Sequence, residues 1–296
     1  MDHVRICNKI DQTIKSLTEL KELFSEESVL TTQSSLVEAS DFESLKEVLF
    51  SDQWPVAVNP SLICDSEEDK KERGVGILEL IIEDSIKGGK FLDFGCGEGH
   101  CVTAAVETLG CGLSIGYDVK AHDWPISRPT DNTRFTTSYE QAAALGPYNA
   151  ILIFDVIDHP VGETPEQILK KAADLLAPDG KIYLRCHPWV SRHGTHLYHK
   201  LNKAFAHLVF TDDELKQLSD HVPENNMKIT YPIRTYNEFF QASNLTSLSE
   251  RVIKENLEPF FRNQKIADRI VSNSKHIGFP DFQMAIQFID YVLVKS

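Results

Sequence analysis

Residues 90–100, KFLDFGCGEGH, constrain the fold of this chain more than any other stretch. The apolar pair Phe91-Leu92 suits a buried strand that ends at Asp93, and three alternating glycines follow before a helix-compatible segment over 101–109. A strand, a tight glycine turn and a helix start bring backbone N–H groups close to a ligand. Glycine suits such a turn because the chain bends sharply and a Cβ would block the ligand. The stretch predicts a ligand-binding loop, with a glycine turn that binds nothing as the alternative.

The glycine spacing argues against a dinucleotide. The dinucleotide fingerprint G-x-G-x-x-G would need a glycine at position 100, which is His100. The pattern D-x-G-x-G-x-G instead resembles motif I of the class I S-adenosylmethionine (SAM) dependent methyltransferases. The resemblance implies that the cofactor-binding residues include Asp93, Gly95, Cys96, Gly97 and Gly99.

A second strand is expected over 113–119, LSIGYDV, directly after the predicted helix. In doubly wound folds an acidic residue at the end of the second strand binds the ribose hydroxyls, since a carboxylate can accept two hydrogen bonds from a diol. We expect Asp118 in that role, with Val119 beside it at the cofactor; an ordinary turn residue at a strand end is the alternative. The resemblance places adenine contacts at Ser138 and Tyr139, after a weak strand near 134–136.

The strongest strand signal is 149–160, NAILIFDVIDHP. Its continuous apolar run suits a strand buried on both faces of a parallel sheet. The DVIDH segment that ends it resembles motif IV of small-molecule SAM methyltransferases, which often reads D-x-[LI]-[ED]-H. The resemblance implies Asp155 and Val156 at the cofactor and Asp158 at the substrate. Because ligands of open α/β sheets bind at the carboxyl ends of the strands, Asp93, Asp118 and Asp155 should lie along one edge.

A dense polar stretch, 187–215, follows the fifth predicted strand on the same edge. Methyl transfer needs an in-line nucleophile and, for a hydroxyl or a protonated amine, a base with a pKa near the working pH. The candidate bases are His187, His193 and His159. The candidate substrate residues are Trp189, Arg192, His196, Tyr198 and His207.

Other interpretations of these histidines stay open. His193, His196 and His199 recur every three residues, which could place them on roughly one helical face, but a metal site needs three or four ligands with supporting partners. We therefore expect no metal, and surface or packing roles are the alternative to substrate contacts. The segment 207–215 is similar to the H-x-x-x-F-T-x-x-E-L element of the same methyltransferases, in which Thr211 would cap a helix.

The remaining periodicity completes an α/β fold. The charged run 67–73 suggests a surface connection that leads into a helix. We predict a doubly wound, seven-stranded sheet, mostly parallel with an antiparallel last strand and helices on both faces. Further helices are expected over 75–86, from Thr164 to about 176, and over 212–220, 235–243 and 258–274; further strands are expected over 181–187 (after a turn at 178–180), 250–256 and 283–295.

The chain is long enough for one α/β domain with additions. We expect an N-terminal helical extension over 1–74 and a methyltransferase domain over 75–296, with helical insertions at about 190–245 and 258–275. Apolar residues at helical spacing over 6–24 and a second helix over 41–50, capped by Asp41, define the extension. It could dock a partner, form a homodimer, act as a lid, or pack on its own domain.

Composition limits the partners. The formal net charge is −14, from 44 acidic and 30 basic residues, so a nucleic-acid partner is disfavoured. No apolar run approaches the length of a membrane span, and the N-terminus has no apolar signal-peptide core. The six cysteines fit no zinc framework and read as reduced thiols, so we expect a cytoplasmic protein.

The resemblance implies a SAM-dependent methyltransferase whose acceptor is an oxygen or nitrogen atom of a small molecule. Two alternatives remain: methylation of a protein or nucleic acid with the N-terminal helices as a docking arm, or a degenerate SAM-binding domain with a structural role. The intact glycine loop argues against the degenerate domain, and its spacing makes a dehydrogenase a distant further option.

Overall fold

The structure is a computed structural model, and it describes residues 40–52, 54–60, 66–122, 124, 132–158, 160, 162–192, 194, 197–199, 201–218, 233–276 and 281–296. The chain divides into two compact units, Met1–Phe50 and Ser51–Ser296. In the first unit, helix α3 (Ser40–Phe50) confirms the helix predicted over 41–50. The helix predicted over 6–24 lies outside the described residues, and the domain boundary predicted at 74/75 stays a prediction.

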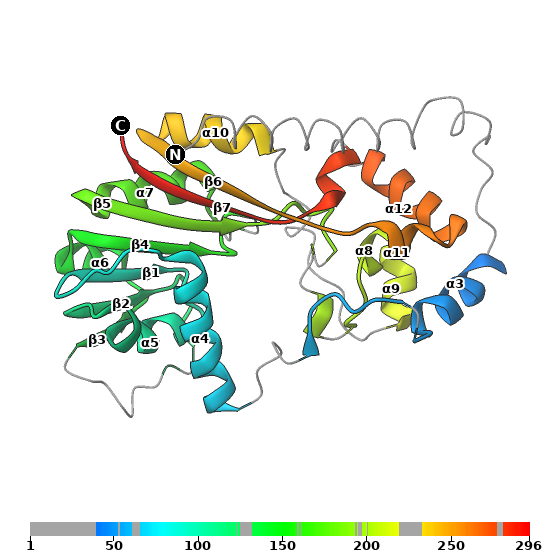
Figure 1. Ribbon diagram of the computed structural model, residues 1–296, viewed down its shortest axis with the longest axis horizontal. Coiled ribbons are helices and arrows are strands. Elements are labelled where there is room, and N and C mark those ends of the chain that lie inside the picture. The colour runs from blue at the N-terminus through cyan, green and yellow to red at the C-terminus, as the bar shows by residue number, and fades with distance from the viewer. Residues whose placement is uncertain are drawn as a thin grey trace, which may run out of the picture. The chain divides into compact units, whose positions relative to one another are not determined.

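The second unit is built on a seven-stranded sheet with the order β3-β2-β1-β4-β5-β7-β6 (Figure 1). Strands β1 to β5 pair in parallel, and β7 runs antiparallel to both of its neighbours. The predicted doubly wound sheet with an antiparallel last strand is therefore confirmed. The strands are β1 (Lys90–Phe94), β2 (Leu113–Tyr117), β3 (Thr133–Thr136), β4 (Tyr148–Phe154), β5 (Leu176–Cys186), β6 (Leu245–Lys254) and β7 (Ile286–Lys295).

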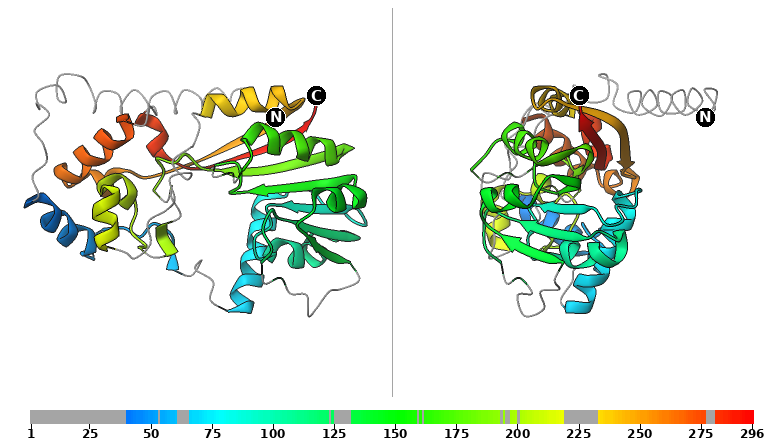
Figure 2. Two further views of the ribbon diagram at one scale, coloured as in Figure 1. Left: turned by 180° about the vertical axis from the view of Figure 1, so that it is seen from behind. Right: turned by 90° about the vertical axis from the view of Figure 1, so that its left-hand side faces the viewer.

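Helices cover both faces of the sheet (Figure 2). Helices α6, α7 and α10 pack on one face, and α4 and α5 pack on the other. Residues 150–153 of β4 are completely buried between these layers. Burying one large aliphatic side chain contributes about 1.5–3 kcal/mol, which explains why the most apolar strand lies near the centre. The helices are α4 (Glu67–Ile81), α5 (His100–Leu109), α6 (Tyr139–Leu145), α7 (Pro165–Leu175) and α10 (Ile233–Ala242).

Helix α4 corrects the sequence prediction. The charged run 67–73, interpreted as a surface connection, forms its first two turns. The Ser66 hydroxyl accepts a hydrogen bond from the Asp69 N–H at 3.1 Å, and the Asp69 carboxylate accepts one from the Ser66 N–H at 3.2 Å. This capping box and the acidic residues of the first turn favour a helix start at Glu67. The helix also ends at Ile81, before the predicted end at 86.

Most other described elements agree with the prediction, with shifted ends. Strand β5 begins at Leu176, earlier than predicted. The turn predicted at 178–180 lies inside this strand as a bulge, opposite the single β4 residue between Tyr148 and Ala150. Strand β6 and helix α10 also begin earlier than predicted, and helix α6 is absent from the prediction. Thr164 caps α7 as predicted, since its hydroxyl accepts from the Gln167 N–H at 3.2 Å.

Two helical segments leave the sheet at the edge where its parallel strands end. Residues 187–218 follow β5, and residues 255–285 join β6 to β7 at the same edge, because β6 runs parallel to β5. The rings of Phe205 and Phe260 meet edge to face with centroids 4.8 Å apart, so the two segments pack into one helical lobe. Its elements are η2 (Leu197–His199), α8 (Ala206–Val209), α9 (Asp212–Leu218), α11 (Glu258–Phe261), α12 (Gln264–His276) and η4 (Asp281–Ala285).

No helix within the described part of the chain is both long enough and apolar enough to cross a membrane.

Candidate functional site

The site is assembled where four adjacent parallel strands end. Asp93 lies near the end of β1, and Asp118 follows β2. Asp155 follows β4, and His187 follows β5. Since β2, β1, β4 and β5 are neighbours in the sheet, their carboxyl ends form one continuous edge, the place where open α/β sheets bind ligands.

The glycine loop connects β1 to α5. Gly95, Gly97 and Gly99 all have positive φ angles, of 86°, 49° and 82°. A Cβ on Gly95 would lie 2.5 Å from Val156 Cγ2, so a glycine is required for the loop to pack against the segment after β4. A Cβ on Gly97 would meet no heavy atom within 4 Å, which leaves open space beside the loop. The N–H groups of Gly95 and Cys96 donate to the backbone oxygen of Tyr117, so what the loop offers a ligand is this open space at the start of a helix, called the cradle below.

Asp118 is tied to the glycine loop. Its Oδ2 accepts a hydrogen bond from the Gly97 N–H at 2.9 Å, and its Oδ1 accepts one from the Lys120 N–H at 3.0 Å. Each carboxylate oxygen has two acceptor sites, so the carboxylate keeps capacity for a further donor. Val119 follows it with 56% of its surface exposed.

Asp93, near the end of β1, and Cys96, in the glycine loop, are both buried. Burial raises the pKa of the Asp93 carboxyl to about 7, with a smaller contribution from the charge of Asp118. Burial also raises the pKa of the Cys96 thiol well above its usual range, so this thiol stays protonated. Cys96 is one of the free cysteines of the described chain, with Cys101, Cys111 and Cys186.

The predicted adenine contacts, Ser138 and Tyr139, lie at the start of α6. The Ser138 hydroxyl caps the helix, accepting from the Gln141 N–H at 3.2 Å. The Tyr139 hydroxyl donates to the backbone oxygen of Lys171 at 3.3 Å, and the Lys171 ammonium lies 5.2 Å from the centre of its ring. Their role at the cofactor stays a prediction.

Asp155, Asp158 and His187 form a cluster at the ends of β4 and β5. His187 Nδ1 lies 2.8 Å from Asp158 Oδ2 and 3.4 Å from Asp155 Oδ1. The His187 backbone N–H also donates to Asp158 Oδ2 at 3.1 Å. Asp158 and His187 are buried, whereas the Asp155 side chain is 17% exposed. Asp155 has a φ of 52°, a strained conformation of the kind found at functional sites.

The cluster fixes the charge of its histidine. Burial alone would lower the pKa of His187, but the charge of Asp158 and hydrogen bonds to Asp155 and Asp158 outweigh it and raise the pKa to about 10. At neutral pH His187 is therefore a buried imidazolium. The ligand atoms of the three side chains lie within 4.8 Å of one another, which a metal ion could bridge, but the ion pair accounts for their arrangement by itself.

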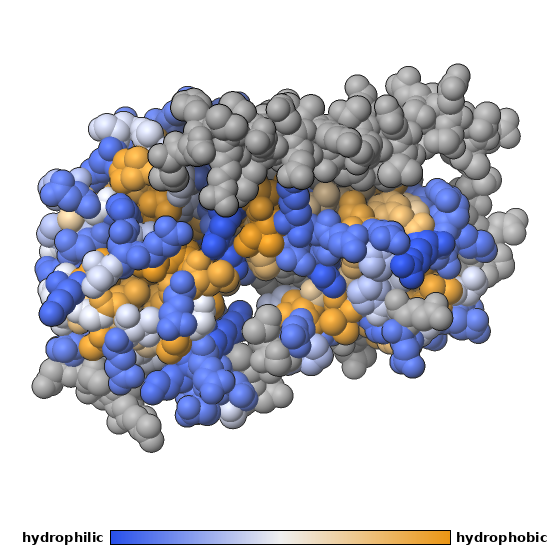
Figure 3. Space-filling view, viewed as in Figure 1, coloured by the Kyte–Doolittle hydropathy of each residue, from blue (hydrophilic) through white to orange (hydrophobic). Residues whose placement is uncertain are grey.

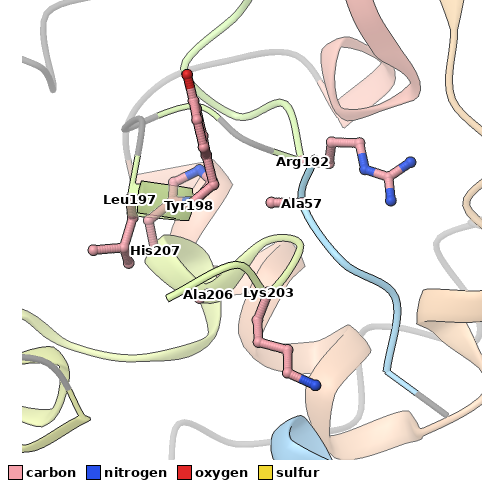
Figure 4. A pocket seen from close by; sticks show the side chains of 7 residues that line it. All are labelled: Ala57, Arg192, Leu197, Tyr198, Lys203, Ala206 and His207. Atoms are coloured by element: carbon pink, nitrogen blue, oxygen red, sulfur yellow. The ribbon is translucent and has the colours of Figure 1, made fainter. Parts of the chain in front are cut away.

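A cavity of about 10 Å³, room for about one water molecule, lies in the helical lobe. Four of the residues that line it are Ala57, Arg192, Tyr198 and Lys203 (Figure 4). The charged ends of Arg192 and Lys203 point away from the other lining side chains. The cavity is therefore too small for a ligand and is not arranged to hold an anion.

His207 also lines this cavity and is neutral. Its Nε2 donates to the backbone oxygen of Trp189 at 2.8 Å, and the two rings meet edge to face with centroids 4.9 Å apart. Burial, together with the charge of His187, lowers the pKa of His207 to about 4. Trp189 and His207 are thus packed together in the interior of the lobe.

Arg192 joins three parts of the second unit. Its guanidinium lies 3.1 Å from Glu255 Oε2 at the end of β6, and it also donates to the backbone oxygen of Val56 at 2.5 Å. It covers the ring of Phe260 at 5.5 Å. These contacts hold the arginine in place, and its substrate role stays a prediction.

Three predicted residues lie outside the described part of the chain: His159, His193 and His196. The side chain of His199 is likewise not described, so the possible face shared by His193, His196 and His199 is not tested.

A family model described as a methyltransferase domain matches residues 71–250. The chain belongs to this family. It is a SAM-dependent methyltransferase with the class I fold, in agreement with the motifs at the glycine loop and after β4.

Solved methyltransferase structures are similar to this chain at a distant level. A putative methyltransferase of Haloferax volcanii, in complex with the Trm112 methyltransferase activator, is 13% identical over 87% of this chain and 94% of its own, with a TM-score of 0.43. A putative SAM-dependent methyltransferase from Listeria monocytogenes is 16% identical over 76% and 99%, with a TM-score of 0.43. The Haemonchus contortus phosphoethanolamine N-methyltransferase 2 in complex with SAM is 12% identical over 76% and 52%, with a TM-score of 0.45. A search of curated proteins found no match.

Proposed function

We propose that this methyltransferase transfers the methyl group of SAM to an oxygen or nitrogen atom of a small-molecule acceptor. The observation that carries the proposal is the edge at which the glycine loop, Asp118 and the Asp155–His187 cluster meet. The helical lobe emerges from the same edge, so an acceptor held by the lobe would meet a cofactor held by the loop.

The residues of the edge fit SAM. The cradle beside Gly97 suits the methionine part, and the remaining acceptor capacity of Asp118 suits the ribose hydroxyls. Exposed Val119 would pack against the adenine side. Asp93, buried with a raised pKa, would gain a charge partner in the α-amino group. When bound, SAM supplies an electrophilic methyl group, and the task of this chain is to hold an acceptor in line with it.

We assign Asp155, expected at the cofactor, to the side of the cofactor that faces the acceptor. Its carboxylate is partly exposed and lies 3.4 Å from Nδ1 of the His187 imidazolium, which orients the carboxylate. It would accept a hydrogen bond from the acceptor O–H or N–H and so aim the lone pair at the methyl group. His187, already protonated, would serve as a positioning residue; if the acceptor needs a base, His193 and His159 are the remaining candidates.

The negative charge of the chain favours a small acceptor over a nucleic acid. A net charge of −14 repels a phosphate backbone, and the motif after β4 resembles that of small-molecule methyltransferases.

Isothermal titration with SAM and S-adenosylhomocysteine (SAH) tests the cofactor site, on the wild-type protein and on Asp118→Ala. Micromolar binding that is lost in the variant supports the placement; absence of binding by the wild type contradicts it. Labelled SAM incubated with a panel of small hydroxyl and amino compounds, and separately with total protein and RNA, tests the acceptor. Label in the small-molecule fraction that is abolished in Asp155→Asn supports the proposal, and label confined to protein or RNA overturns the small-molecule part.

A further inference from the structure

Trp124 reaches the glycine loop from the β2–β3 connection, although no motif of the sequence marks it. Its indole Nε1–H donates to the backbone oxygen of Gly97 at 2.8 Å. The N–H of the same glycine donates to Asp118 at 2.9 Å. The central residue of the loop is therefore held on its N–H side by a carboxylate and on its C=O side by an indole.

The Trp124 ring has a second fixed partner. It stacks on Phe135 of β3 with ring centroids 5.4 Å apart and planes 16° from parallel. Phe135 in turn packs on the loop, since a Cβ on Gly99 would lie 2.4 Å from its ring and one on Gly116 would lie 2.7 Å away. The two rings form a stacked pair beside the loop, and the indole of this pair stays half-buried.

We infer that Trp124 is a positioning residue for SAM. It fixes the Gly97 peptide so that the loop is formed before the cofactor arrives, and its ring forms a wall next to the ribose that Asp118 would hold. The inference rests on the cofactor placement proposed above. A loop fixed in advance binds more tightly, because less conformational freedom is lost on binding.

The chain offers a matched control. Trp54 also donates its indole N–H to a backbone oxygen, that of Ala204, at 2.9 Å. It lies in the core of the helical lobe and is 5% exposed. Trp54→Phe and Trp124→Phe therefore remove the same kind of hydrogen bond, one in the lobe and one at the glycine loop.

The test is titration of the wild type, Trp124→Phe and Trp54→Phe with SAH. Binding is measured both by calorimetry and by tryptophan emission. Trp124→Phe should weaken SAH binding about fivefold to tenfold, as expected for one hydrogen bond, and should lose the emission change that SAH causes. Trp54→Phe should lower the melting temperature but keep both the wild-type Kd and the emission change.

A wild-type Kd in Trp124→Phe, or an emission change that persists in it, overturns the inference while the cofactor site stands. A wild type that binds no SAH overturns the proposed function and the inference with it. If Trp124→Phe does not fold, Phe135→Leu takes its place: it removes the stacking partner and should also weaken SAH binding, and an unchanged Kd there overturns the inference.

Discussion

The imidazole of His187 donates to the carboxylate of Asp158 at 2.8 Å, with both side chains buried at the end of the central strands. The pair lies next to Asp155, the partly exposed carboxylate that we place at the acceptor, since His187 Nδ1 is also 3.4 Å from Asp155 Oδ1. A buried ion pair of this kind is sensitive to the loss of either partner, because the remaining charge would be left without compensation.

The pair predicts how stability depends on pH. The pKa of His187 is about 10 in the folded protein against 6.5 when unperturbed, so its contribution to stability is complete below 6.5 and is lost as the pH rises towards 10. The unfolding free energy of the wild type should therefore fall more steeply over this range than that of His187→Gln. Urea unfolding at a series of pH values measures both slopes.

His100 provides the control for this prediction. Burial lowers its pKa, so it does not titrate in the alkaline range. His100→Gln should keep the wild-type slope. Equal slopes for the wild type and His187→Gln would show that His187 is not protonated in the folded protein.

Strands β5, β7 and β6, at one side of the sheet, carry a second charge cluster whose two arginines differ in exposure. Asp290 of β7 pairs with Arg185 at 2.5 Å and with Arg251 at 2.6 Å. Arg185 is buried between strands, whereas the Arg251 side chain is 47% exposed. Asp290→Asn should cost about 3–5 kcal/mol of unfolding free energy, because it leaves a buried guanidinium uncompensated. Arg251→Gln should cost less than about 1 kcal/mol, as for an exposed pair, and urea unfolding of the two variants tests this order.

The elements that depend only on residues close together in the sequence were predicted well. The apolar run 150–153 and the capping residue Thr164 act locally, so β4 and α7 were predicted closely. Helix α4 was placed too late because its charged start was interpreted as a surface feature, although Ser66 and Asp69 form a cap that is readable in the sequence.

The site was predictable only in part, for a different reason. The resemblance located the glycine loop and Asp118, whose positions follow from the strand order. The pairing of His187 with Asp158 depends on two strand ends meeting, and it turned a candidate base into an imidazolium. The contact of Trp124 with Gly97 likewise depends on how a connection folds back, which no spacing encodes.

Asp93 predicts the pH dependence of cofactor binding. Its pKa of about 7 means that a large fraction of the carboxyl is protonated below neutrality, and a bound α-ammonium group would favour the ionised form. The Kd for SAH should therefore decrease about fivefold to tenfold from pH 6 to 7.5, with proton release on binding at the lower pH. Calorimetry in buffers of different ionisation enthalpy measures both effects. Asp93→Asn should bind weakly with little pH dependence; an unchanged pH profile in this variant would exclude Asp93 as the titrating group.

Gly97 and Gly88 allow the cradle itself to be tested. Both have positive φ angles, of 49° and 71°, and a Cβ on either would meet no heavy atom within 4 Å. Gly88 precedes β1 and lies at the opposite end of the strand from the glycine loop. Alanine at either position should cost about 1–2 kcal/mol of unfolding free energy through backbone strain, so stability alone cannot distinguish the two variants.

Cofactor binding should distinguish them. The new methyl group of Gly97→Ala enters the space where we place the methionine part of SAM, so the Kd for SAH should rise at least about tenfold by calorimetry. Gly88→Ala should bind SAH like the wild type, because its methyl group points into solvent-accessible space at the far edge. Equal Kd values for the two variants would mean that the cofactor does not approach Gly97, and the cradle would then have to lie on another side of the loop.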